Sequence, residues 1–354
     1  MSNLFYNLPI SDLEEIKHNL SDISQEFSGE DVLILGGAGA LGTAVKVFLL
    51  YLNKYVLLEP MRIVSVDNYI GRPKPLQIDD SNLLNIEHDL ILPLDEKVFG
   101  YRFSFMFNMS GNAAPTSGYG RFPIETMDVS YLGVKNLLRL AMQHNAKIIN
   151  MSSSEVVGSV PLNELPSDEN IIPRLHTMNL RSCYDLFKAA GVETQSYVYK
   201  EKFGLDVKVV RPFNVQCYYR QGDSRVIAAF IERLLKNEKM SVYMPSTQTR
   251  TFVFWTDFLT GIIRVLLNGK QFLYNVGRED EMITIKELAI KLENISGKNN
   301  MIELVEAPTI FKHEPQYRQP SIKRINLELG YSAKVNLDEI LKRMYFWAKE
   351  NYKF

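Results

Sequence analysis

A glycine-rich segment directly after a short apolar run is the feature that most constrains this chain. Residues 31–35 read DVLIL, and GGAGALG follows from Gly36 to Gly42. Continuously apolar runs of this length are typical of strands buried on both faces of a parallel sheet. Glycines spaced GxxGxxG between a strand and a helix allow a tight turn, the approach of backbone N–H groups to a pyrophosphate, and close packing of the helix on the sheet. The segment therefore predicts a dinucleotide-binding βαβ unit.

The rest of the chain continues this alternation of strands and helices. Strands that alternate with helices predict a Rossmann-type, doubly wound parallel α/β sheet. After about Asn214 the pattern changes, and helix-start signals at Thr284 and Asn336 with a helix stop at Gly330 predict a smaller mixed α/β substrate-binding lobe. The further strands are expected at 62–66, 104–109, 147–151 and 206–210, and helices at 134–143, 184–203, 226–236 and 325–329.

The same patterns divide the chain into three parts. Apolar residues at helical spacing predict a leading amphipathic helix at 11–27, which a capping box of Ser11 and Glu14 would start. We therefore expect an N-terminal helical extension at 1–29. The dinucleotide-binding domain is expected at 30–216 and 248–277, and the substrate-binding lobe at 217–247 and 278–354.

Charge and cysteine content exclude several classes of protein. The 354 residues carry 40 Lys+Arg and 41 Asp+Glu, so no basic excess indicates nucleic acid or an anionic membrane as a partner. The two cysteines, Cys183 and Cys217, form neither a disulfide framework nor a zinc motif and favour a reducing cytoplasm. No signal peptide, membrane span or metal-ligand spacing of the five histidines is visible. We expect a cytoplasmic protein without metal, nucleic acid or membrane partners.

The second predicted strand ends at Asp67. A carboxylate there can accept hydrogen bonds from adenosine ribose hydroxyls and would repel a 2′-phosphate, which favours NAD over NADP. An ordinary turn aspartate beside Asn68 is the alternative. Asp67 follows Gly36 by 31 residues, which exceeds the usual spacing of about 20. We attribute the excess to a longer first helix at 45–58.

Tyr184 and Lys188 form a YxxxK motif, which on a helix places both side chains on one face. An ammonium about 4 Å from a phenol favours the phenolate by roughly 4 kcal/mol at an effective dielectric constant of about 20. The pKa of Tyr184 would then move from about 10 towards neutrality. Such a tyrosine can take a proton from a sugar hydroxyl while hydride leaves the same carbon for NAD+. The alternative is an ordinary surface pair, which the upstream glycine motif makes less favoured.

Together these motifs resemble the extended short-chain dehydrogenase/reductases, the NAD-dependent epimerase/dehydratase family of nucleotide-sugar enzymes. The resemblance covers about residues 30–345 and is greatest to the UDP-glucuronate decarboxylases. One departure is CYYR at 217–220, where the family reads Gly-Pro-Arg. The matching segments are VDNYIGRPK from Val66, HDL from His88, SSSEVVG from Ser152, RSCYDLFK from Arg181, RPFN from Arg211, SRVIAAFI from Ser224, QTRTF from Gln248 and PQYRQPSI from Pro315.

The resemblance implies roles for individual residues, and a homodimer that associates through helices such as 184–203. Residues expected to act in catalysis are Ser153, Ser154, Glu155, Tyr184, Lys188 and Arg250. Residues expected to bind NAD are Gly36, Gly39, Ala40, Leu41, Gly42, Asp67, Asn68, Asp89, Leu90, Tyr184 and Lys188. Residues expected to bind the UDP-sugar are Pro115, Tyr119, Asn214, Arg225, Arg250 and Arg318.

The family's reactions share oxidation at sugar carbon 4 and differ in their later steps. The 4,6-dehydratases carry Asp-Glu after the catalytic Ser/Thr, whereas this chain has Ser154 and Glu155. The 4-epimerases usually carry small or neutral residues where Glu155 stands. A decarboxylase needs the fewest dedicated catalytic side chains after the oxidation, because a 4-keto uronic acid is a β-keto acid that loses carbon dioxide readily. The sequence thus favours decarboxylation of UDP-glucuronate to UDP-xylose or its 4-keto precursor, as in polysaccharide biosynthesis.

Two other functions and two residue roles stay open. A 4-epimerase or 4,6-dehydratase is the alternative, and a non-catalytic NAD-binding protein is least favoured because Ser153, Tyr184 and Lys188 are all present. Glu155 would either disfavour the substrate carboxylate in the ground state or orient a water. Arg250 would either hold that carboxylate or protonate carbon 5.

Overall fold

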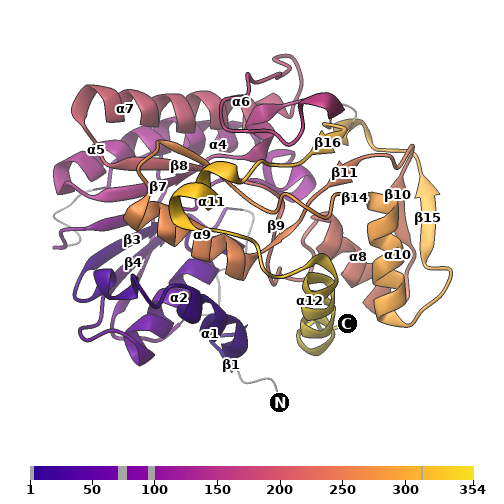
Figure 1. Cartoon of the computed structure of the whole chain (residues 1–354), viewed down its shortest axis with the longest axis horizontal. Coiled ribbons are helices and arrows are strands. Elements are labelled where there is room, and N and C mark those ends of the chain that lie inside the picture. Colours follow the sequence, from indigo (N-terminus) through magenta and orange to yellow (C-terminus); the bar gives the residue numbers. More distant parts are fainter. Residues whose placement is uncertain (1–3, 71–77, 95–99, 312–313) are drawn as a thin grey trace.

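A seven-stranded parallel sheet forms the centre of the computed structural model, which describes residues 4–70, 78–94, 100–311 and 314–354 (Figure 1). Its strand order is β13-β8-β7-β6-β3-β4-β5, and every neighbouring pair is parallel. The strands are β3 (Asp31–Leu35), β4 (Arg62–Asp67), β5 (Leu83–Glu87), β6 (Phe105–Asn108), β7 (Lys147–Met151), β8 (Val207–Pro212) and β13 (Leu273–Val276).

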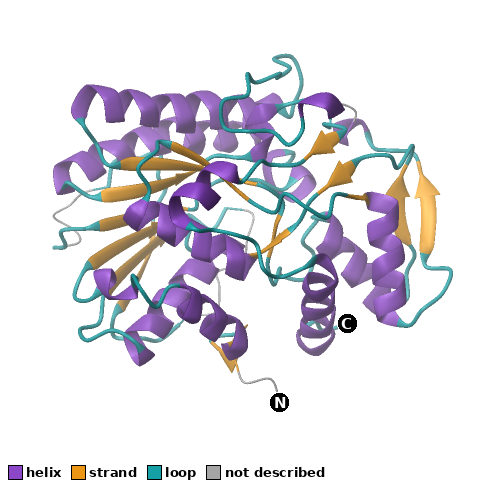
Figure 2. Ribbon diagram, in the orientation of Figure 1, coloured by secondary structure: helices purple, strands orange, loops and turns teal. Residues whose placement is uncertain are grey.

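Helices cover both faces of this sheet, as the doubly wound fold requires (Figure 2). The side chains of β3 alternate between two cores: Val32 packs with one and Leu33 with the other. The first core includes α1 (Ile10–Asn19), α2 (Ala40–Tyr55) and α9 (Trp255–Asn268), and the second includes α5 (Val134–His144). The apolar texture of these strands thus comes from burial on both faces, and the predicted fold class is confirmed.

The predicted strands are confirmed with ends that differ by no more than two residues, but the sequence missed both edge strands. β5 reads LLNIE and is half exposed, so it lacks the apolar texture of a buried strand. β13 has four residues and includes Asn275, whose buried amide donates to the Ser167 carbonyl at 3.0 Å. Both strands are stabilised by contacts that the local sequence does not carry.

Three helix predictions are corrected by the structure. α2 begins at Ala40 and ends at Tyr55, so it starts earlier than the predicted 45–58. The predicted helix at 184–203 is an uninterrupted helical stretch that contains a π segment, η6 (Lys188–Thr194), between α6 (Ser182–Phe187) and α7 (Gln195–Phe203).

The leading helix is shorter than predicted, and its predicted capping box is wrong. α1 ends at Asn19, and a 3₁₀ turn, η1 (Ser24–Phe27), follows. Pro9 occupies the N-cap position with φ −59° and ψ 131°, and no side chain caps this end. Ser11 therefore lies inside the first turn.

The helix signals of the C-terminal region are confirmed. Thr284 and Glu287 form a reciprocal capping box at α10 (Ile285–Ser296). Asn336 accepts a hydrogen bond from the Glu339 amide at the start of α12 (Leu337–Asn351). Gly330, at φ 64°, ends α11 (Lys323–Leu329).

Short sheets and helices next to the central sheet form a smaller region at the right of Figure 1. β11 (Thr249–Arg250) pairs in parallel with β16 (Tyr317–Arg318) and places Arg250 opposite Arg318. The described elements here are α8 (Val226–Leu235) and α10, with the pairs β9 (Val215–Gln216) and β12 (Val253–Phe254), β10 (Met240–Tyr243) and β15 (Ile302–Val305), and the trio β14 (Ile283–Thr284), β11 (Thr249–Arg250) and β16 (Tyr317–Arg318). No helix among the described residues has both the length and the apolar character needed to cross a membrane.

The N-terminal segment is part of the core. Leu13 and Ile16 of α1 are fully buried, and α1 packs on α9. Asp12 is also buried; its carboxylate accepts a 2.7 Å hydrogen bond from the Tyr218 hydroxyl and lies 3.1 Å from the Arg343 guanidinium. The extension thus connects to the segment after β9 and to the C-terminal helix α12.

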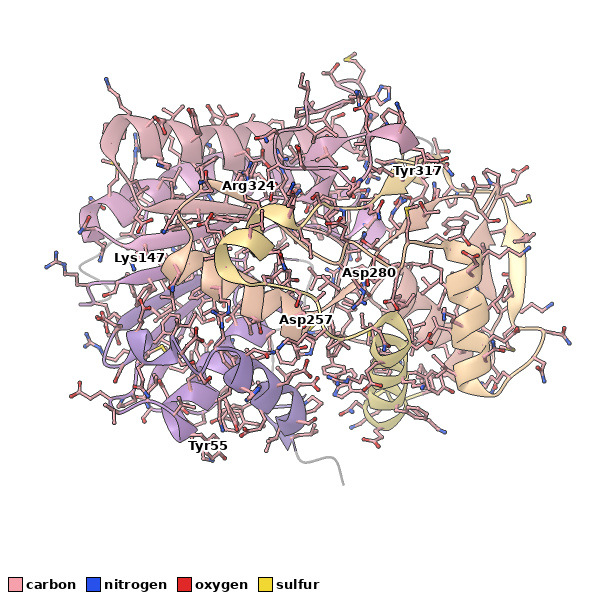
Figure 3. All side chains as sticks on the ribbon, in the orientation of Figure 1. Tyr55, Lys147, Asp257, Asp280, Tyr317 and Arg324 are labelled. Atoms are coloured by element: carbon pink, nitrogen blue, oxygen red, sulfur yellow. The ribbon has the colours of Figure 1, made fainter. Side chains whose placement is uncertain are left out.

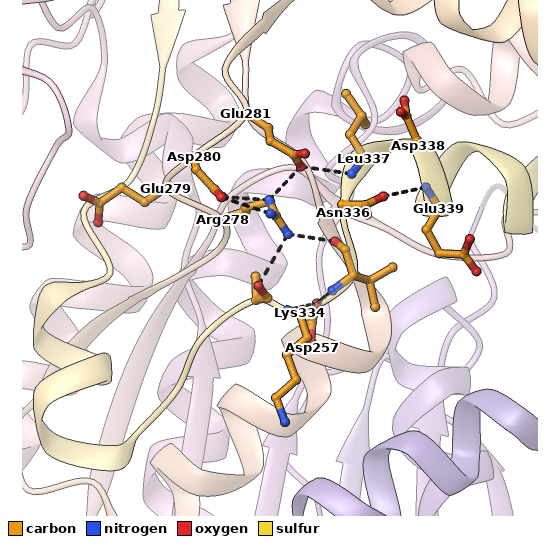
Figure 4. A network of polar contacts seen from close by, with 12 residues as sticks. Asp257, Arg278, Glu279, Asp280, Glu281, Lys334, Asn336, Leu337, Asp338 and Glu339 are labelled. Atoms are coloured by element: carbon orange, nitrogen blue, oxygen red, sulfur yellow. Dashed lines mark hydrogen bonds and ion pairs between the residues drawn. The ribbon is translucent and has the colours of Figure 1, made fainter.

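A polar network joins α9 to the loops that precede β14 and α12 (Figure 4). Arg278 Nε lies 2.7 Å from Asp280 and 2.9 Å from Glu281. The Asp257 carboxylate accepts 2.9 Å hydrogen bonds from the amides of Lys334 and Val335. Figure 3 labels Asp257 and Asp280 near the centre of the view; Asp257 is buried, whereas the Asp280 side chain is exposed. Burial raises the pKa of Asp257 to about 6, in spite of these hydrogen bonds.

Replacing Asp257 by asparagine should remove one source of pH-dependent stability. The folded-state pKa of Asp257 lies above its usual value of 3.8, so between the two the native state holds a proton that the unfolded state has lost. The wild type therefore loses stability as pH rises through this window. Asparagine can still accept both backbone bonds, so we expect Asp257→Asn to gain ~1–3 kcal/mol relative to the wild type between about pH 4 and about pH 7.

Urea unfolding at both pH values measures this difference. The exposed Asp338, which pairs with Lys291, offers a matched control, and Asp338→Asn should leave the pH dependence unchanged. A free-energy difference between Asp257→Asn and the wild type that does not vary with pH would contradict the prediction.

Candidate active site

A cavity of about 570 Å³ opens at the carboxyl ends of β3 and β4 and extends into the smaller region. Ligands of open α/β sheets bind at such strand ends, where the strand order reverses. The sequence-predicted residues Gly42, Tyr119 and Lys188 lie behind the cavity wall. Predicted residues that line the cavity are Gly36, Gly39, Ala40, Leu41, Asp67, Asn68, Asp89, Leu90, Pro115, Ser153, Ser154, Glu155, Tyr184, Asn214, Arg225, Arg250 and Arg318.

The glycine loop turns between β3 and α2 at one end of the cavity. Gly36 has φ +73°, a conformation that disfavours other residues. A Cβ atom on Gly42 would lie 2.1 Å from the Gly36 carbonyl oxygen, so helix and loop are in backbone contact. This arrangement leaves the N-terminus of α2 open to the cavity, as binding of a pyrophosphate requires.

Carboxylates next to the glycine loop shape the same end of the cavity. Asp67 Oδ2 accepts a 2.9 Å hydrogen bond from the Ala38 amide, and Oδ1 accepts one of 2.8 Å from the Tyr69 amide. Asn68 donates to Asp89 at 3.2 Å. Asp67 thus closes a turn, as its alternative interpretation predicts, and also lines the cavity. Arg220, in the segment that departs from the family pattern, donates to the Ala38 carbonyl at 3.3 Å.

Tyr184 and Ser153 meet in the middle of the cavity. The Ser153 side chain hydrogen-bonds the Tyr184 phenol, and the Tyr184 ring stacks on Tyr119 with centroids 5.3 Å apart and planes at 16°. Ser153 also accepts a hydrogen bond from the Glu155 amide at 3.1 Å. Tyr119 thus packs against the Tyr184 ring, while Ser153 contacts the Tyr184 hydroxyl.

The predicted effect of Lys188 on Tyr184 is not found. Burial raises the pKa of Tyr184 to about 12, the direction opposite to the prediction. The Lys188 ammonium donates to the carbonyls of Met151 at 2.8 Å and Ser110 at 3.3 Å, and burial lowers the pKa of Lys188 to about 8. Backbone oxygens at the ends of β7 and β6 thus bind the ammonium, because Lys188 lies in the buried π segment against the sheet.

Five charged side chains cluster beside the cavity, and all of them except Arg181 line it; we name Arg181, Glu155, Arg318, Arg250 and Glu314 the arginine–glutamate cluster, and the part of the cavity that they border the sugar end. Glu155 is bound by Arg181 on one oxygen and by Arg318 at 2.7 Å on the other. Burial alone would raise the pKa of Glu155, but the two guanidinium groups outweigh burial and hold this pKa at about 2. Arg250 lies 3.0 Å from Glu314.

The predicted residues Arg225 and Asn214 lie on the wall between the two ends of the cavity. The Arg225 guanidinium lies over the Tyr219 ring, 4.3 Å from its centroid, and 3.7 Å from Asp223. Asn214 has φ 42° and donates to the Thr251 carbonyl at 2.8 Å. Both side chains are thus fixed by protein contacts and border the cavity.

Residues 32–277 match the sequence profile of the NAD dependent epimerase/dehydratase family. The chain belongs to this family. UDP-glucuronic acid decarboxylase 3 of Arabidopsis thaliana is 30% identical over 317 residues, with 88% of this chain and 87% of that protein covered. UDP-glucuronic acid decarboxylase 1 of Danio rerio is 28% identical over 324 residues, with 90% and 73% covered.

Solved structures show the same fold for the family member described here. The structure of UDP-glucuronic acid 4-epimerase from Bacillus cereus, in complex with UDP-glucuronic acid and NAD, superposes with a TM-score of 0.76 at 23% identity. The superposition covers 91% of this chain and all of that chain. The profile match confirms the resemblance to the epimerase/dehydratase family, and the superposition confirms the fold.

Several residues of the site were not predicted from the sequence. Arg181 lay within the matching segment RSCYDLFK but was given no role, and Glu314 precedes PQYRQPSI by one residue. Tyr243 and Phe311, whose rings are 5.1 Å apart, line the far end of the cavity from separate elements. Within the described parts of the chain, no group of three or more His, Cys, Asp or Glu side chains could hold a metal ion.

Proposed function

We propose that this member of the NAD-dependent family decarboxylates UDP-glucuronate through a 4-keto intermediate, to UDP-xylose or the 4-keto pentose. The observation that carries the proposal is the state of Glu155. A 4,6-dehydratase needs an acid–base pair after its catalytic serine or threonine, but here Ser154 replaces one acid, and Arg181 and Arg318 hold Glu155 ionised. A group with a pKa of about 2 cannot serve as a general acid near neutral pH.

The chemistry of a β-keto acid suits such a site. Tyr184, with Ser153, would remove the proton of the carbon-4 hydroxyl once the positive charge of bound NAD+ lowers the pKa of the phenol below the value of about 12 that burial gives it, and NAD+ would supply the hydride acceptor. In the resulting 4-keto uronic acid the bond between carbons 5 and 6 breaks, carbon dioxide leaves, and the electron pair moves onto the 4-keto oxygen. A proton then returns to carbon 5 to give the 4-keto pentose; formation of UDP-xylose would further require return of the hydride to carbon 4 and of a proton to the carbonyl oxygen. The relatives named as UDP-glucuronic acid decarboxylases support this assignment.

We assign NAD binding and UDP-sugar binding to different parts of the chain, according to which part contains the central sheet. The seven strands all fall within 30–216 and 248–277, which supports assigning NAD to this part and the UDP-sugar to 217–247 and 278–354. The catalytic, cofactor and substrate roles that the resemblance implies remain proposals for the cavity residues, and Gly42 and Lys188 would act from behind the wall. The free, buried Cys183 and Cys217 support a cytoplasmic site of action.

We also propose a homodimer. Large apolar side chains are exposed along the helices that run from Pro123 to His144 and from Ser182 to Phe203. The two helical stretches pack against each other, and exposed apolar surface that is contiguous across such neighbours marks protein interfaces. Its exposed members are Ile124, Tyr131, Leu132, Met142, Tyr197, Val198 and Phe203. Light scattering on a size-exclusion column tests the dimer, and a monomer at all concentrations would exclude it.

The function is tested by incubating the purified protein with UDP-glucuronate, with and without added NAD+, and following products by proton NMR and mass spectrometry. A product lighter by carbon dioxide supports the proposal, and the sugar resonances distinguish xylose from the keto pentose. An unchanged mass with new sugar resonances would show 4-epimerisation, and loss of water would show dehydration. Binding of UDP-sugars without any conversion would point to a non-catalytic protein.

A further inference from the structure

The pairing of Arg250 with Glu314 decides how much positive charge the sugar end of the cavity offers. The Arg250 side chain is 5% exposed and its terminal nitrogens are engaged on two sides. One nitrogen donates to the Thr249 carbonyl at 2.8 Å and to the Gln316 carbonyl at 3.2 Å, and the other lies 3.0 Å from the Glu314 carboxylate. Both Arg250 and Glu314 line the cavity, so any ligand group at Arg250 also meets Glu314.

In the arginine–glutamate cluster, two neighbouring arginines lie between two glutamates. Arg250 and Arg318 lie opposite each other in the parallel β11–β16 register, between Glu314 on one side and Glu155 on the other. Burial and the neighbouring Arg318 together lower the pKa of Arg250 to about 10, although Glu314 and Glu155 act in the opposite direction. Glu314 thus offsets both the burial of Arg250 and its repulsion by Arg318.

The position of Glu314 makes it a competitor for an anionic ligand. Arg181 and Arg318 both pair with Glu155, whereas Arg250 pairs with a second carboxylate, Glu314, which lies between η7 (Thr309–Phe311) and β16. A sugar carboxylate that approaches Arg250 must displace Glu314 or accept it as a like-charged neighbour. A neutral hydroxymethyl group at the same sugar carbon meets no such electrostatic cost.

We propose that Glu314 is a specificity-determining residue that weakens binding of a sugar carboxylate at Arg250, an inference that rests on the proposed function. Weak binding of this group favours the reaction. Decarboxylation disperses the negative charge of the carboxylate. An arginine that binds the carboxylate tightly therefore stabilises the bound substrate more than the transition state. Glu314 balances Arg250 so that the substrate is held mainly through its nucleotide and hydroxyl groups.

The test compares two ligands that differ at one group: UDP-glucuronate carries a carboxylate where UDP-glucose carries a hydroxymethyl group. We expect Glu314→Gln to tighten UDP-glucuronate binding by about tenfold and to change UDP-glucose binding by less than about twofold. Turnover of UDP-glucuronate should fall while its KM also falls, a combination that signals lost destabilisation of the bound ground state. Titration calorimetry on the NAD-loaded protein gives the two dissociation constants.

Two variants serve as controls. Glu314→Asp keeps the charge and should retain the wild-type ratio of the two dissociation constants. Glu164→Gln removes a carboxylate from a comparable Glu–Arg pair, 2.8 Å from Arg174 and outside the cavity, and should also retain it. An unchanged ratio in Glu314→Gln, or the same shift in Glu314→Asp, would overturn the inference.

The binding readout separates this inference from the proposed function. If the wild type binds both ligands but does not decarboxylate UDP-glucuronate, the proposed function fails, and the ratio measured in Glu314→Gln still decides the role of Glu314. If the wild type binds neither ligand, both the function and the role of Glu314 are refuted.

Discussion

Replacing Tyr184 by phenylalanine is expected to lower turnover of UDP-glucuronate by at least about 10³-fold while NAD remains bound. The phenol is the group that Ser153 hydrogen-bonds at the cavity surface, so its loss removes the proposed base and leaves the cofactor end intact. The phenylalanine ring can keep the stacking contact with Tyr119. Stopped-flow absorbance of the reduced nicotinamide reports the first hydride transfer directly.

Tyr119→Phe is the matched control for this change. It removes the other hydroxyl of the stacked pair, which accepts a 3.4 Å hydrogen bond from Arg181, and should cost less than about tenfold in turnover. The NAD content of each purified variant shows whether the cofactor end has changed. Retention of more than about a tenth of wild-type turnover in Tyr184→Phe would refute the role of Tyr184 as the base.

Gly42→Ala should have the largest effect on cofactor binding. The new methyl carbon would lie 2.1 Å from the Gly36 carbonyl oxygen and 2.8 Å from Gly37 Cα. These are backbone atoms, so no side-chain rotation relieves the overlap, and α2 must move away from the loop. We expect NAD affinity to fall by at least about 100-fold, and the unfolding free energy to fall by about 1–3 kcal/mol because of overpacking.

Gly37→Ala provides the comparison, because its new methyl carbon would lie 2.0 Å from the Ser65 hydroxyl oxygen, which can rotate away. We expect a much smaller loss of NAD affinity in this variant. Thermal unfolding of both variants with and without NAD gives stability and ligand stabilisation together. Equal NAD affinity in Gly42→Ala and the wild type would show that close packing of loop and helix does not support the cofactor site.

The central strands could be predicted from sequence because burial on both faces demands an unbroken apolar run, as in β3. The edge strand β5 has no such demand, since its outer positions are exposed. The start of α10 was predicted correctly because the Thr284 side chain caps it. The start of α1 was predicted wrongly, since Pro9 and not Ser11 occupies the N-cap position. Short sequence patterns thus predict the strands and helix ends that are determined by their own residues.

The site divides in the same way. Residues within one motif, such as Ser153 and Glu155, could be placed from sequence because their spacing is fixed by a single turn. The pairing of Glu155 with Arg181 and Arg318 joins three distant segments, and no local pattern carries it. The pKa of Tyr184 was predicted in the wrong direction because burial, a property of the whole fold, outweighs the sequence neighbour Lys188.

The burial of α1 has a consequence for the order in which this protein can be completed during translation. Asp12 is 206 residues from Tyr218 and 331 residues from Arg343. At about 10 residues per second, a ribosome needs roughly half a minute to supply the last of these partners. α1 is therefore synthesised long before α9 and α12, and its docking is completed only after both have been made. Until then its apolar face stays available to chaperones and to neighbouring nascent chains, and a chain released before α12 leaves the Asp12 carboxylate without the Arg343 charge.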